Sequence, residues 1–226
     1  DLEKLRVIQE NSSTMCPNEE SDIEFENEIK IARKKKDTLG GSISVIVKGL
    51  PVGLGSYVHY DRKIDGRIAS AFMSVQSVKA VSIGNGLDAY KSYGTEFHDE
   101  IAIEDKELKR NTNNSGGIEG GMTTGEDLVA TAYLKPISTT LKPLKSVNLK
   151  TKEEVETVYE RSDTCSVPRA VPIFETIIAI EVLKCLLEKT GGDNKKEISA
   201  RKESLPGASI DDFDMGSETW TMEYEL

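Results

Sequence analysis

The chain has 226 residues, enough for one sizeable domain or two small ones, and a formal net charge of −10 at pH 7. Seven acidic residues and no lysine or arginine lie in segment 203–226, so most of the acidity belongs to the C-terminal tail. A general nucleic-acid binder would carry a basic face and is excluded, whereas a local basic pocket for an anionic ligand is not. Three cysteines without ligand-like spacing and two histidines argue against a structural zinc site, and we expect no metal.

Cysteine usage and hydropathy indicate the compartment. An odd number of cysteines and the lack of a signal-peptide pattern favour a reducing environment. Residues 173–187 come nearest to a membrane span, but two glutamates and a lysine interrupt the roughly 18 apolar residues that a span needs. We therefore expect a soluble, cytoplasmic protein with neither a membrane nor a nucleic acid as partner. The chain begins with Asp1 rather than methionine, which indicates a processed or partial chain.

The first half of the chain predicts two helices and two strands. Residues 22–36 have the apolar spacing of an amphipathic helix, and the alternation in residues 42–48 is that of a strand. The glycine-rich segment 49–55 ends this strand. Residues 65–75 predict a helix and residues 78–83 a strand. Strand, helix and strand within about 40 residues have the spacing of a crossover unit.

The second half predicts one long loop before further regular structure. Residues 88–115 are polar and loop-like, and so long a connection is more often functional or mobile than a plain link. Residues 128–134 predict a strand, and residues 151–160 either a short charged helix or a strand. The clearest helix is predicted over 171–188, with Pro172 near its start and glycines past its end. Its predicted buried stripe is Ile173, Ile177, Ile180, Leu183, Leu186 and Leu187.

These elements together predict the α+β fold class. We expect residues 1–192 to form one domain. Residues 193–226 have low hydrophobicity, high charge and no apolar period, and they predict a disordered acidic tail.

The glycine-rich run 116–125 is the least ordinary part of the sequence, because five of its ten residues are glycine. One interpretation is a wide loop or a bulged hairpin between two strands. The other is a functional loop, since a backbone without Cβ atoms can lie against a flat ring or point N–H groups at a phosphate. The run alone favours the first interpretation, because glycine runs are weak motifs.

Charged and hydroxyl side chains follow the glycine run. Lys135 and Arg161 are cations placed after backbone breaks, and residues 138–140 offer hydroxyl donors. Taken singly, Lys135 reads as a surface lysine and Arg161 as an ion-pair partner of Glu160 or Asp163. Asp163 reads as a helix-entry cap, or as an acid or base group placed over a ligand. Together with the glycines, the set suggests a site for a flat, phosphorylated ligand.

Other candidate motifs are weaker. His59 and His98 lie in polar segments without partners at ligand or triad spacing, and neither is assigned a catalytic role. Segment 49–55 could cradle a phosphate, but it lacks the Lys-Ser/Thr that follows the glycines of a P-loop. A rigid turn after a strand is an equally good interpretation of that segment.

The whole set of segments resembles chorismate synthase. Five blocks stand in the family's order, and Cys16-Pro17 and the sequence DTLGG at 37–41 fit its pattern too. The blocks are GLPVGLG at 49–55, AFMSV at 71–75 with SVKAVSIGNG at 77–86, NNSGGIEGG at 113–121, KPIST at 135–139, and RSD at 161–163 with VPRA at 167–170. The resemblance implies part of a chorismate synthase-like β-α-β sandwich.

The resemblance also implies a function. It points to a lyase of the shikimate pathway that converts 5-enolpyruvylshikimate 3-phosphate to chorismate and phosphate by 1,4-anti elimination. The family needs reduced FMN although there is no net redox change, and the protein binds, orients and electrostatically tunes that cofactor. The full-length enzyme is implied to be a homotetramer.

Site residues follow from the resemblance block by block. Asp163 falls on an aspartate that assists proton transfer with the flavin, and Arg169 is a weaker candidate nearby. The implied cofactor-binding residues are Gln76, Ser77, Gly120, Lys135, Pro136, Ile137, Ser138, Thr139 and Arg161.

The chain departs from the family in two main respects. Ser162 stands where the family commonly has histidine. The chain also matches only the rear part of the family, whereas the front part carries two catalytic histidines and several substrate-holding arginines. His59 and His98 do not lie on those motifs, so this fragment alone is expected to be inactive. The alternative function is a truncated, non-catalytic module that binds flavin or another subunit.

Overall fold

A three-stranded sheet forms the centre of the protein in the computed structural model, which describes residues 2–205, 207 and 209–212. The strands are β1 (Gly41–Val47), β7 (Leu128–Leu134) and β2 (Val78–Ile83), and β7 lies between the other two. Because β7 is antiparallel to both neighbours, β1 and β2 are parallel to each other. All three strands were predicted from the sequence, with bounds that differ by at most one residue.

The predicted crossover unit is present, with a third strand inserted between its two strands. Helix α3 (Ile64–Met73) connects β1 to β2, as predicted for residues 65–75. Its buried side chains Ile64, Ile68 and Phe72 follow the 3.6-residue period and face the sheet. The segment between α3 and the preceding strand contains the short 3-10 helix η1 (Tyr60–Arg62).

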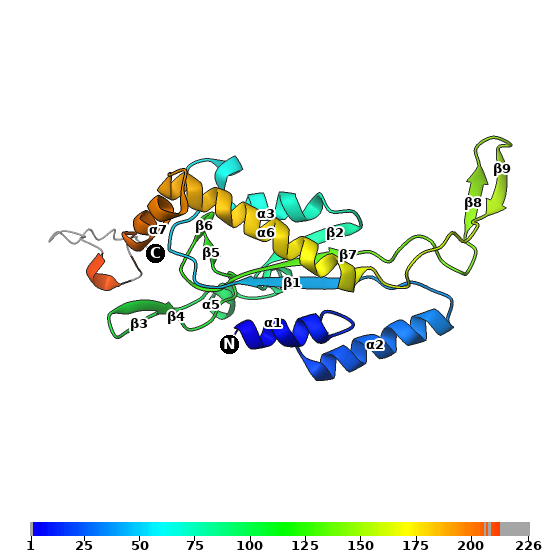
Figure 1. Ribbon diagram of the computed structural model, residues 1–226, viewed down its shortest axis with the longest axis horizontal. Coiled ribbons are helices and arrows are strands. Elements are labelled where there is room, and N and C mark those ends of the chain that lie inside the picture. The colour runs from blue at the N-terminus through cyan, green and yellow to red at the C-terminus, as the bar shows by residue number, and fades with distance from the viewer. Residues whose placement is uncertain (1, 206, 208, 213–226) are drawn as a thin grey trace, which may run out of the picture.

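The long helix α6 (Val167–Thr190) lies beside α3 on the same face of the sheet (Figure 1). Phe72 and Phe174 meet edge to face between the two helices, with ring centroids 4.9 Å apart. This contact, with the fully buried Leu54 and Leu128, marks the centre of the hydrophobic core. None of the helices in the described residues is long and apolar enough to cross a membrane.

The predicted buried stripe of α6 is largely wrong. The buried hydrophobic residues of α6 are Ala170, Phe174, Ile178 and Cys185. Three residues of the predicted stripe are instead about half exposed: Ile173 (48%), Ile180 (47%) and Leu183 (50%). The helix is apolar on two opposite faces, so its period could not show which face packs on the sheet. Only Ile177 and Leu186 of the predicted stripe pack against the core.

Two helices precede the sheet. Helix α1 (Leu2–Asn11) lies in a segment for which no regular structure was predicted, and α2 (Glu19–Lys34) confirms the helix predicted over 22–36. Asn18 caps α2, because its side chain accepts a hydrogen bond from the Ser21 N–H. Helix α1 reaches α6 through the hydrogen bond from Gln9 Nε2 to Glu175 Oε1, at 3.0 Å.

The loop predicted over 88–115 is wrong for much of its length. The short helix α4 (Gly86–Ala89) overlaps its start. The segment contains the short helix α5 (Gly94–Phe97) and a hairpin of β3 (Ile101–Glu104) and β4 (Glu107–Arg110). The two turn residues of this hairpin, Asp105 and Lys106, both have positive φ. A turn of this kind is normally signalled by Asn-Gly or Asp-Gly, and Asp-Lys does not give that signal.

A second hairpin projects away from the sheet (Figure 1). It consists of β8 (Lys145–Asn148) and β9 (Glu153–Glu156), so the strand alternative for residues 151–160 is the correct one. All eight residues of these strands are exposed. We call residues 135–163, which comprise this hairpin and the two segments leading to it, the arm.

The predicted disordered tail is wrong where the structure describes it. Asn194 is the N-cap of helix α7 (Lys195–Glu203), and its side chain accepts a hydrogen bond from the Glu197 N–H. Arg201 of this helix donates to the Thr190 carbonyl at 2.9 Å. The 3-10 helix η2 (Ile210–Asp212) follows. Asn194 and Glu197 have the spacing of a capping box, a signal that outweighs the high charge here. Residues 213–226 lie outside the described residues, so disorder there stays a prediction.

Candidate functional site

Four segments that are distant in sequence meet at one end of the sheet. The Lys135 N–H donates to the Ser77 carbonyl at 2.9 Å. The Thr38 hydroxyl donates to the Ile137 carbonyl at 2.6 Å, and the Leu39 N–H donates to the Thr164 carbonyl at 2.9 Å. We call this region, formed by residues 38–41, 76–77, 135–139 and 161–169, the arm end of the sheet.

The strand register explains why these segments meet. Leu134, the last residue of β7, pairs with Gly41 at the start of β1 and with Val78 at the start of β2. Antiparallel strands place the end of one beside the beginning of the next, so the loops before β1 and β2 meet the loop after β7. Gly40 has to be glycine here, because a Cβ atom on it would collide with the Leu134 carbonyl and Pro136.

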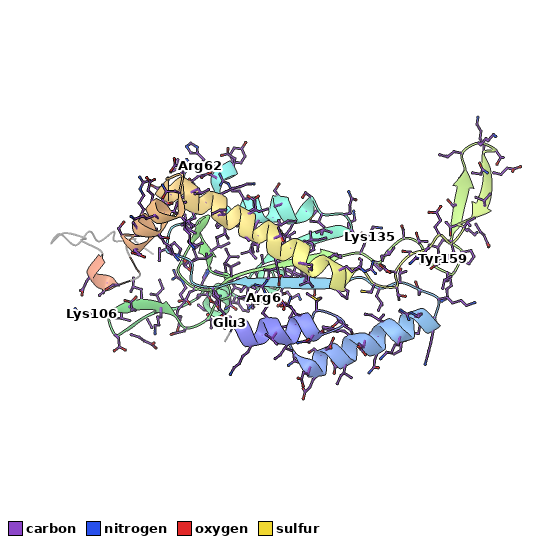
Figure 2. The ribbon with its side chains drawn as sticks, in the orientation of Figure 1. Glu3, Arg6, Arg62, Lys106, Lys135 and Tyr159 are labelled. Atoms are coloured by element: carbon purple, nitrogen blue, oxygen red, sulfur yellow. The ribbon has the colours of Figure 1, made fainter. Side chains whose placement is uncertain are left out.

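The predicted cations Lys135 and Arg161 are both exposed. Within the described residues, neither side chain makes an ion pair or a hydrogen bond. Figure 2 shows Lys135 beyond the end of β7, where the chain leaves the sheet for the arm. The structure therefore does not support the ordinary interpretation of Arg161 as a partner of Glu160 or Asp163. Two positive charges remain available to an anionic ligand.

Asp163 is paired with Arg169 rather than with Arg161. The Arg169 Nη1 and Asp163 Oδ2 atoms are 2.9 Å apart, and the two side chains are 79% and 47% exposed. The N-cap of α6 is Ser166, so the interpretation of Asp163 as the cap of this helix is wrong. Its role as an acid or base group stays a prediction.

The remaining predicted residues of the arm end flank this cluster. Gln76 and Ser77 form the connection from α3 to β2, and Ser77 has a φ of 75°, in the left-handed region. The run 135–139 forms the first segment of the arm. Of the predicted residues in that run, Pro136 and Ser138 are exposed, and Ile137 and Thr139 are partly buried.

Gly120 lies at a different end of the fold. It forms, with Gly121, the turn of a tight hairpin of β5 (Ile118–Glu119) and β6 (Met122–Thr123). The Gly121 carbonyl accepts from the Ile64 N–H at 3.0 Å, so this hairpin contacts the first residue of α3. Ser77 follows the other end of that ten-residue helix, about 15 Å away along its axis. The hairpin interpretation of the glycine run is confirmed, whereas flavin contact by Gly120 stays a prediction.

Part of the glycine run has a clear packing role. Gly116 lies against Gly84, which directly follows β2, and a Cβ atom on either residue would collide with the backbone of the other. The Val129 carbonyl accepts from the Gly84 N–H at 2.9 Å, and the Val129 N–H donates to the Gly116 carbonyl at 3.0 Å. The close approach of two main chains therefore explains Gly116 without a ligand.

The loop before the glycine run is organised by a carboxylate. Asp99 accepts hydrogen bonds from the Thr112 hydroxyl and from the N–H groups of Asn114 and Ser115. Burial raises the pKa of Asp99, but these hydrogen bonds outweigh it and hold the pKa below the ordinary aspartate value. The ionised side chain thus fixes the entry to the glycine run.

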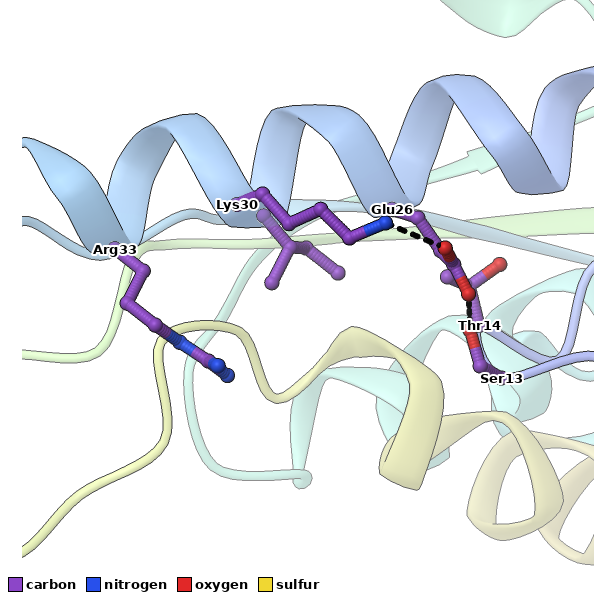
Figure 3. A pocket seen from close by; sticks show the side chains of 6 residues that line it. Ser13, Thr14, Glu26, Lys30 and Arg33 are labelled. Atoms are coloured by element: carbon purple, nitrogen blue, oxygen red, sulfur yellow. Dashed lines mark hydrogen bonds and ion pairs between the residues drawn. The ribbon is translucent and has the colours of Figure 1, made fainter.

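A hollow of about 230 Å³ lies elsewhere, between the turn joining α1 to α2 and α2 itself (Figure 3). Its polar groups bind one another: Lys30 pairs with Glu26 at 2.8 Å, and the Ser13 hydroxyl donates to Glu26. These contacts, that of Lys30 first, lower the pKa of Glu26. Arg33 also lines the hollow but lies apart from this pair (Figure 3). None of the predicted site residues lines this hollow, which belongs to the packing of the two helices.

Sequence reasoning missed Thr38 and Gly40 as parts of the arm end. Their segment, 37–41, matched the family pattern, but its single aspartate and two adjacent glycines do not by themselves identify a site. The link from Arg169 to Asp163 also could not be read from spacing alone. Among the described residues, no group of three His, Cys, Asp or Glu side chains is arranged to hold a metal ion.

The comparisons with known proteins agree with the arrangement of the blocks. The family model described as chorismate synthase matches residues 2–187. A chorismate synthase of Geobacter sulfurreducens is 43% identical over 205 residues, which cover 87% of this chain and 52% of that protein. One of Caldicellulosiruptor bescii is 44% identical over 197 residues, covering 87% of this chain and 51% of that protein.

A solved structure is similar as well. A crystal structure of chorismate synthase matches with a TM-score of 0.73 and 36% identity, covering 88% of this chain and 52% of that one. The chain thus spans about half the length of the relatives that it matches. The mixed helices and sheet of the structure agree with the α+β class predicted from the sequence. The chain belongs to the chorismate synthase family.

Proposed function

We propose that this chain is the cofactor-binding portion of an enzyme that converts 5-enolpyruvylshikimate 3-phosphate to chorismate and phosphate by 1,4-anti elimination. Family membership supports the reaction class. The cofactor assignment rests on one observation: the Lys135 N–H donates a hydrogen bond to the Ser77 carbonyl at the arm end of the sheet. These two residues are 58 positions apart in the sequence, and the resemblance assigns both to the flavin.

The residues of the arm end fit reduced FMN. Lys135 and Arg161 make no ion pair in the described chain, and two free cations suit a phosphorylated cofactor. In the proposal, Gln76, Ser77, the run 135–139 and Arg161 hold the flavin. Gly120 contacts the flavin only if the cofactor extends along α3. When bound, reduced flavin supplies electron density to the allylic system of the substrate as phosphate leaves. Asp163 assists the proton transfer.

The relatives are about twice as long as this chain. In the proposal, activity also requires the catalytic histidines and substrate-holding arginines that the resemblance implies for the front part of the family's chain. In the proposal, the complete enzyme is a cytoplasmic homotetramer. Mass photometry of the reconstituted protein checks this: a stable monomer or dimer contradicts the tetramer.

A second candidate function is a non-catalytic module that binds another polypeptide. The half-exposed Ile173, Ile180 and Leu183 on the outer face of α6 favour it, because a helix that is apolar on both sides is usually buried on both. This surface is equally suited to the other half of a complete enzyme. The two functions differ in whether the assembled protein catalyses elimination.

The test is reconstitution with the front half of a relative. The chain is co-expressed with the N-terminal half of the Geobacter sulfurreducens relative, and chorismate and phosphate are measured with and without reduced FMN. The control is that relative split at the same position. We expect flavin-dependent formation of both products. A complex that binds neither FMN nor substrate, while the split control is active, refutes the proposed function. A complex that assembles and binds FMN without turnover supports the module.

A further inference from the structure

The backbone on both sides of Asp163 is fixed by hydrogen bonds. The Tyr159 hydroxyl contacts both the N–H and the carbonyl of Ser162, each at 3.4 Å. On the other side, the Thr164 carbonyl accepts from the Leu39 N–H, and Leu39 and Cys165 form an isolated parallel bridge. The main freedom left to Asp163 is therefore the rotation of its side chain.

Arg169 restrains that rotation. Its guanidinium Nη1 lies 2.9 Å from Asp163 Oδ2. Arg169 is the third residue of α6, a 24-residue helix that is anchored in the core by Phe174. The arginine thus connects the Asp163 carboxylate to a helix that packs in the core.

The pair is not explained by stability. Both partners are largely exposed, and exposed ion pairs contribute little to folding. A cation in the first turn is also opposed by the helix dipole, which favours anions there. The start of α6 has no acidic residue in its first turn, and its N-cap Ser166 makes no side-chain capping hydrogen bond. Departures of this kind from the stabilising pattern concentrate at functional sites.

We propose that Arg169 is a positioning residue that holds the Asp163 carboxylate in one orientation at the cofactor site. This inference rests on the proposed function, in which Asp163 assists proton transfer. Arg169 acts through Asp163 and does not itself bind the cofactor. Its effect is therefore on the catalytic step and not on the affinity for FMN or substrate.

The first test needs no catalytic activity. Three-bond NMR couplings report the χ1 rotamer of Asp163 in the chain, and R169A is compared with wild type. The matched control is K184A, which removes the Lys184–Glu181 ion pair from the same helix far from its first turn. We expect one rotamer in wild type and K184A, and averaged rotamers in R169A. A single unchanged rotamer in R169A overturns the proposal.

The second test measures the consequence in the reconstituted enzyme. We expect R169A to lower kcat by about 10-fold to 100-fold, with KM and the FMN dissociation constant within about twofold of wild type. R169K should recover much of the loss, and R169A should add nothing in a D163N background. If R169A weakens FMN binding, or if its kcat equals that of K184A, Arg169 does not act by positioning the Asp163 carboxylate. An inactive wild-type complex counts against the proposed function, and the NMR result then decides the positioning role by itself.

Discussion

The two ends of strand β7 use their polar groups in opposite ways. At the Leu128 end, hydrogen bonds join the glycine run to segment 49–55 and, through Val129, to Gly84 at the end of β2. Thr123 is 2% exposed, and its hydroxyl makes two hydrogen bonds. At the Leu134 end, the charged side chains of Lys135 and Arg161 are exposed and unpaired in the described chain. One end stabilises the fold, and the other leaves its charges available to a ligand.

The contrast teaches that a motif and its site need not coincide. The glycine run is the most unusual segment of the sequence. Most of its glycines nevertheless serve packing, because they allow the main chains of two segments to approach closely. The plainer segment 135–139 holds the exposed cation and touches Ser77 and Thr38. Substitutions at the Leu128 end should therefore change stability, and substitutions at the arm end should change ligand binding.

The largest expected effect is that of Gly116→Ala. Gly116 has a φ of 64°, and an added Cβ would strike the Gly84 backbone, so the free energy of unfolding should fall by about 3 kcal/mol. Gly120→Ala is the matched control, because its φ is 60° but open space surrounds the added atom. The control should lose only about 1 kcal/mol in urea unfolding. Equal losses for the two variants contradict the packing role of Gly116.

Thr123→Val should cause the next largest loss in the free energy of unfolding. It removes a hydroxyl that donates to the Pro51 carbonyl at 2.6 Å and accepts from the Leu54 N–H at 2.8 Å. The buried Leu54 N–H and the partly buried Pro51 carbonyl then lack this partner, and we expect a loss of about 2 kcal/mol in chemical denaturation. Thr124→Val, at a partly buried neighbour, should cost less than about 0.5 kcal/mol. A neutral Thr123→Val would show that this end of the sheet is not held by its polar contacts.

The third prediction concerns pH. The pKa of Asp99 is lowered in the folded protein, so its contribution to stability is present above the ordinary aspartate pKa. That contribution is lost as the pH falls below about 4 and through the lowered value. The protection factors of the Asn114 and Ser115 amides, which compare each exchange rate with the intrinsic rate at the same pH, should therefore fall in acid. Asp99→Asn should show low protection of both amides at every pH. Unchanged protection at pH 3 contradicts this role.

The smallest effect on stability is expected at the arm end. Lys135→Ala and Arg161→Ala should each change the free energy of unfolding by less than about 0.5 kcal/mol, because the side chains have no partners in the described chain. In the reconstituted enzyme, each should weaken FMN binding by about tenfold, the loss of one charged hydrogen bond. Lys142→Ala, an exposed lysine further along the arm, is the control. Marked destabilisation by Lys135→Ala or Arg161→Ala would contradict the proposal that the Leu134 end of β7 contributes to ligand binding and not to stability.

The sequence predicted the sheet well because period-2 and period-3.6 patterns report burial directly. Ile43 and Val45 alternate into the core as expected, and Ile68 and Phe72 lie one helical turn apart. The same logic failed for α6, since its two faces are both apolar and only the contact of Phe174 with Phe72 distinguishes them. Local features also escaped the prediction, because composition does not report them. They are the turn formed by Asp105 and Lys106, and the N-cap formed by Asn194.

The candidate site was predicted by resemblance more than by pattern. The positions of Lys135 and Arg161 suggested a site, but taken singly each was better explained as an ordinary surface or ion-pair residue. The junction with Ser77 depends on β7 lying between β1 and β2, and the partner of Asp163 depends on where α6 begins. Such relations arise from tertiary structure and have no signal in a single sequence.

The most direct test of the account is FMN-dependent chorismate formation by the reconstituted enzyme, measured for wild type, Lys135→Ala and Gly120→Ala. The account predicts activity for wild type, loss of FMN affinity for Lys135→Ala without loss of stability, and slight destabilisation for Gly120→Ala. Wild-type FMN affinity and turnover in the Lys135→Ala enzyme would contradict the assignment of the cofactor to the arm end of the sheet.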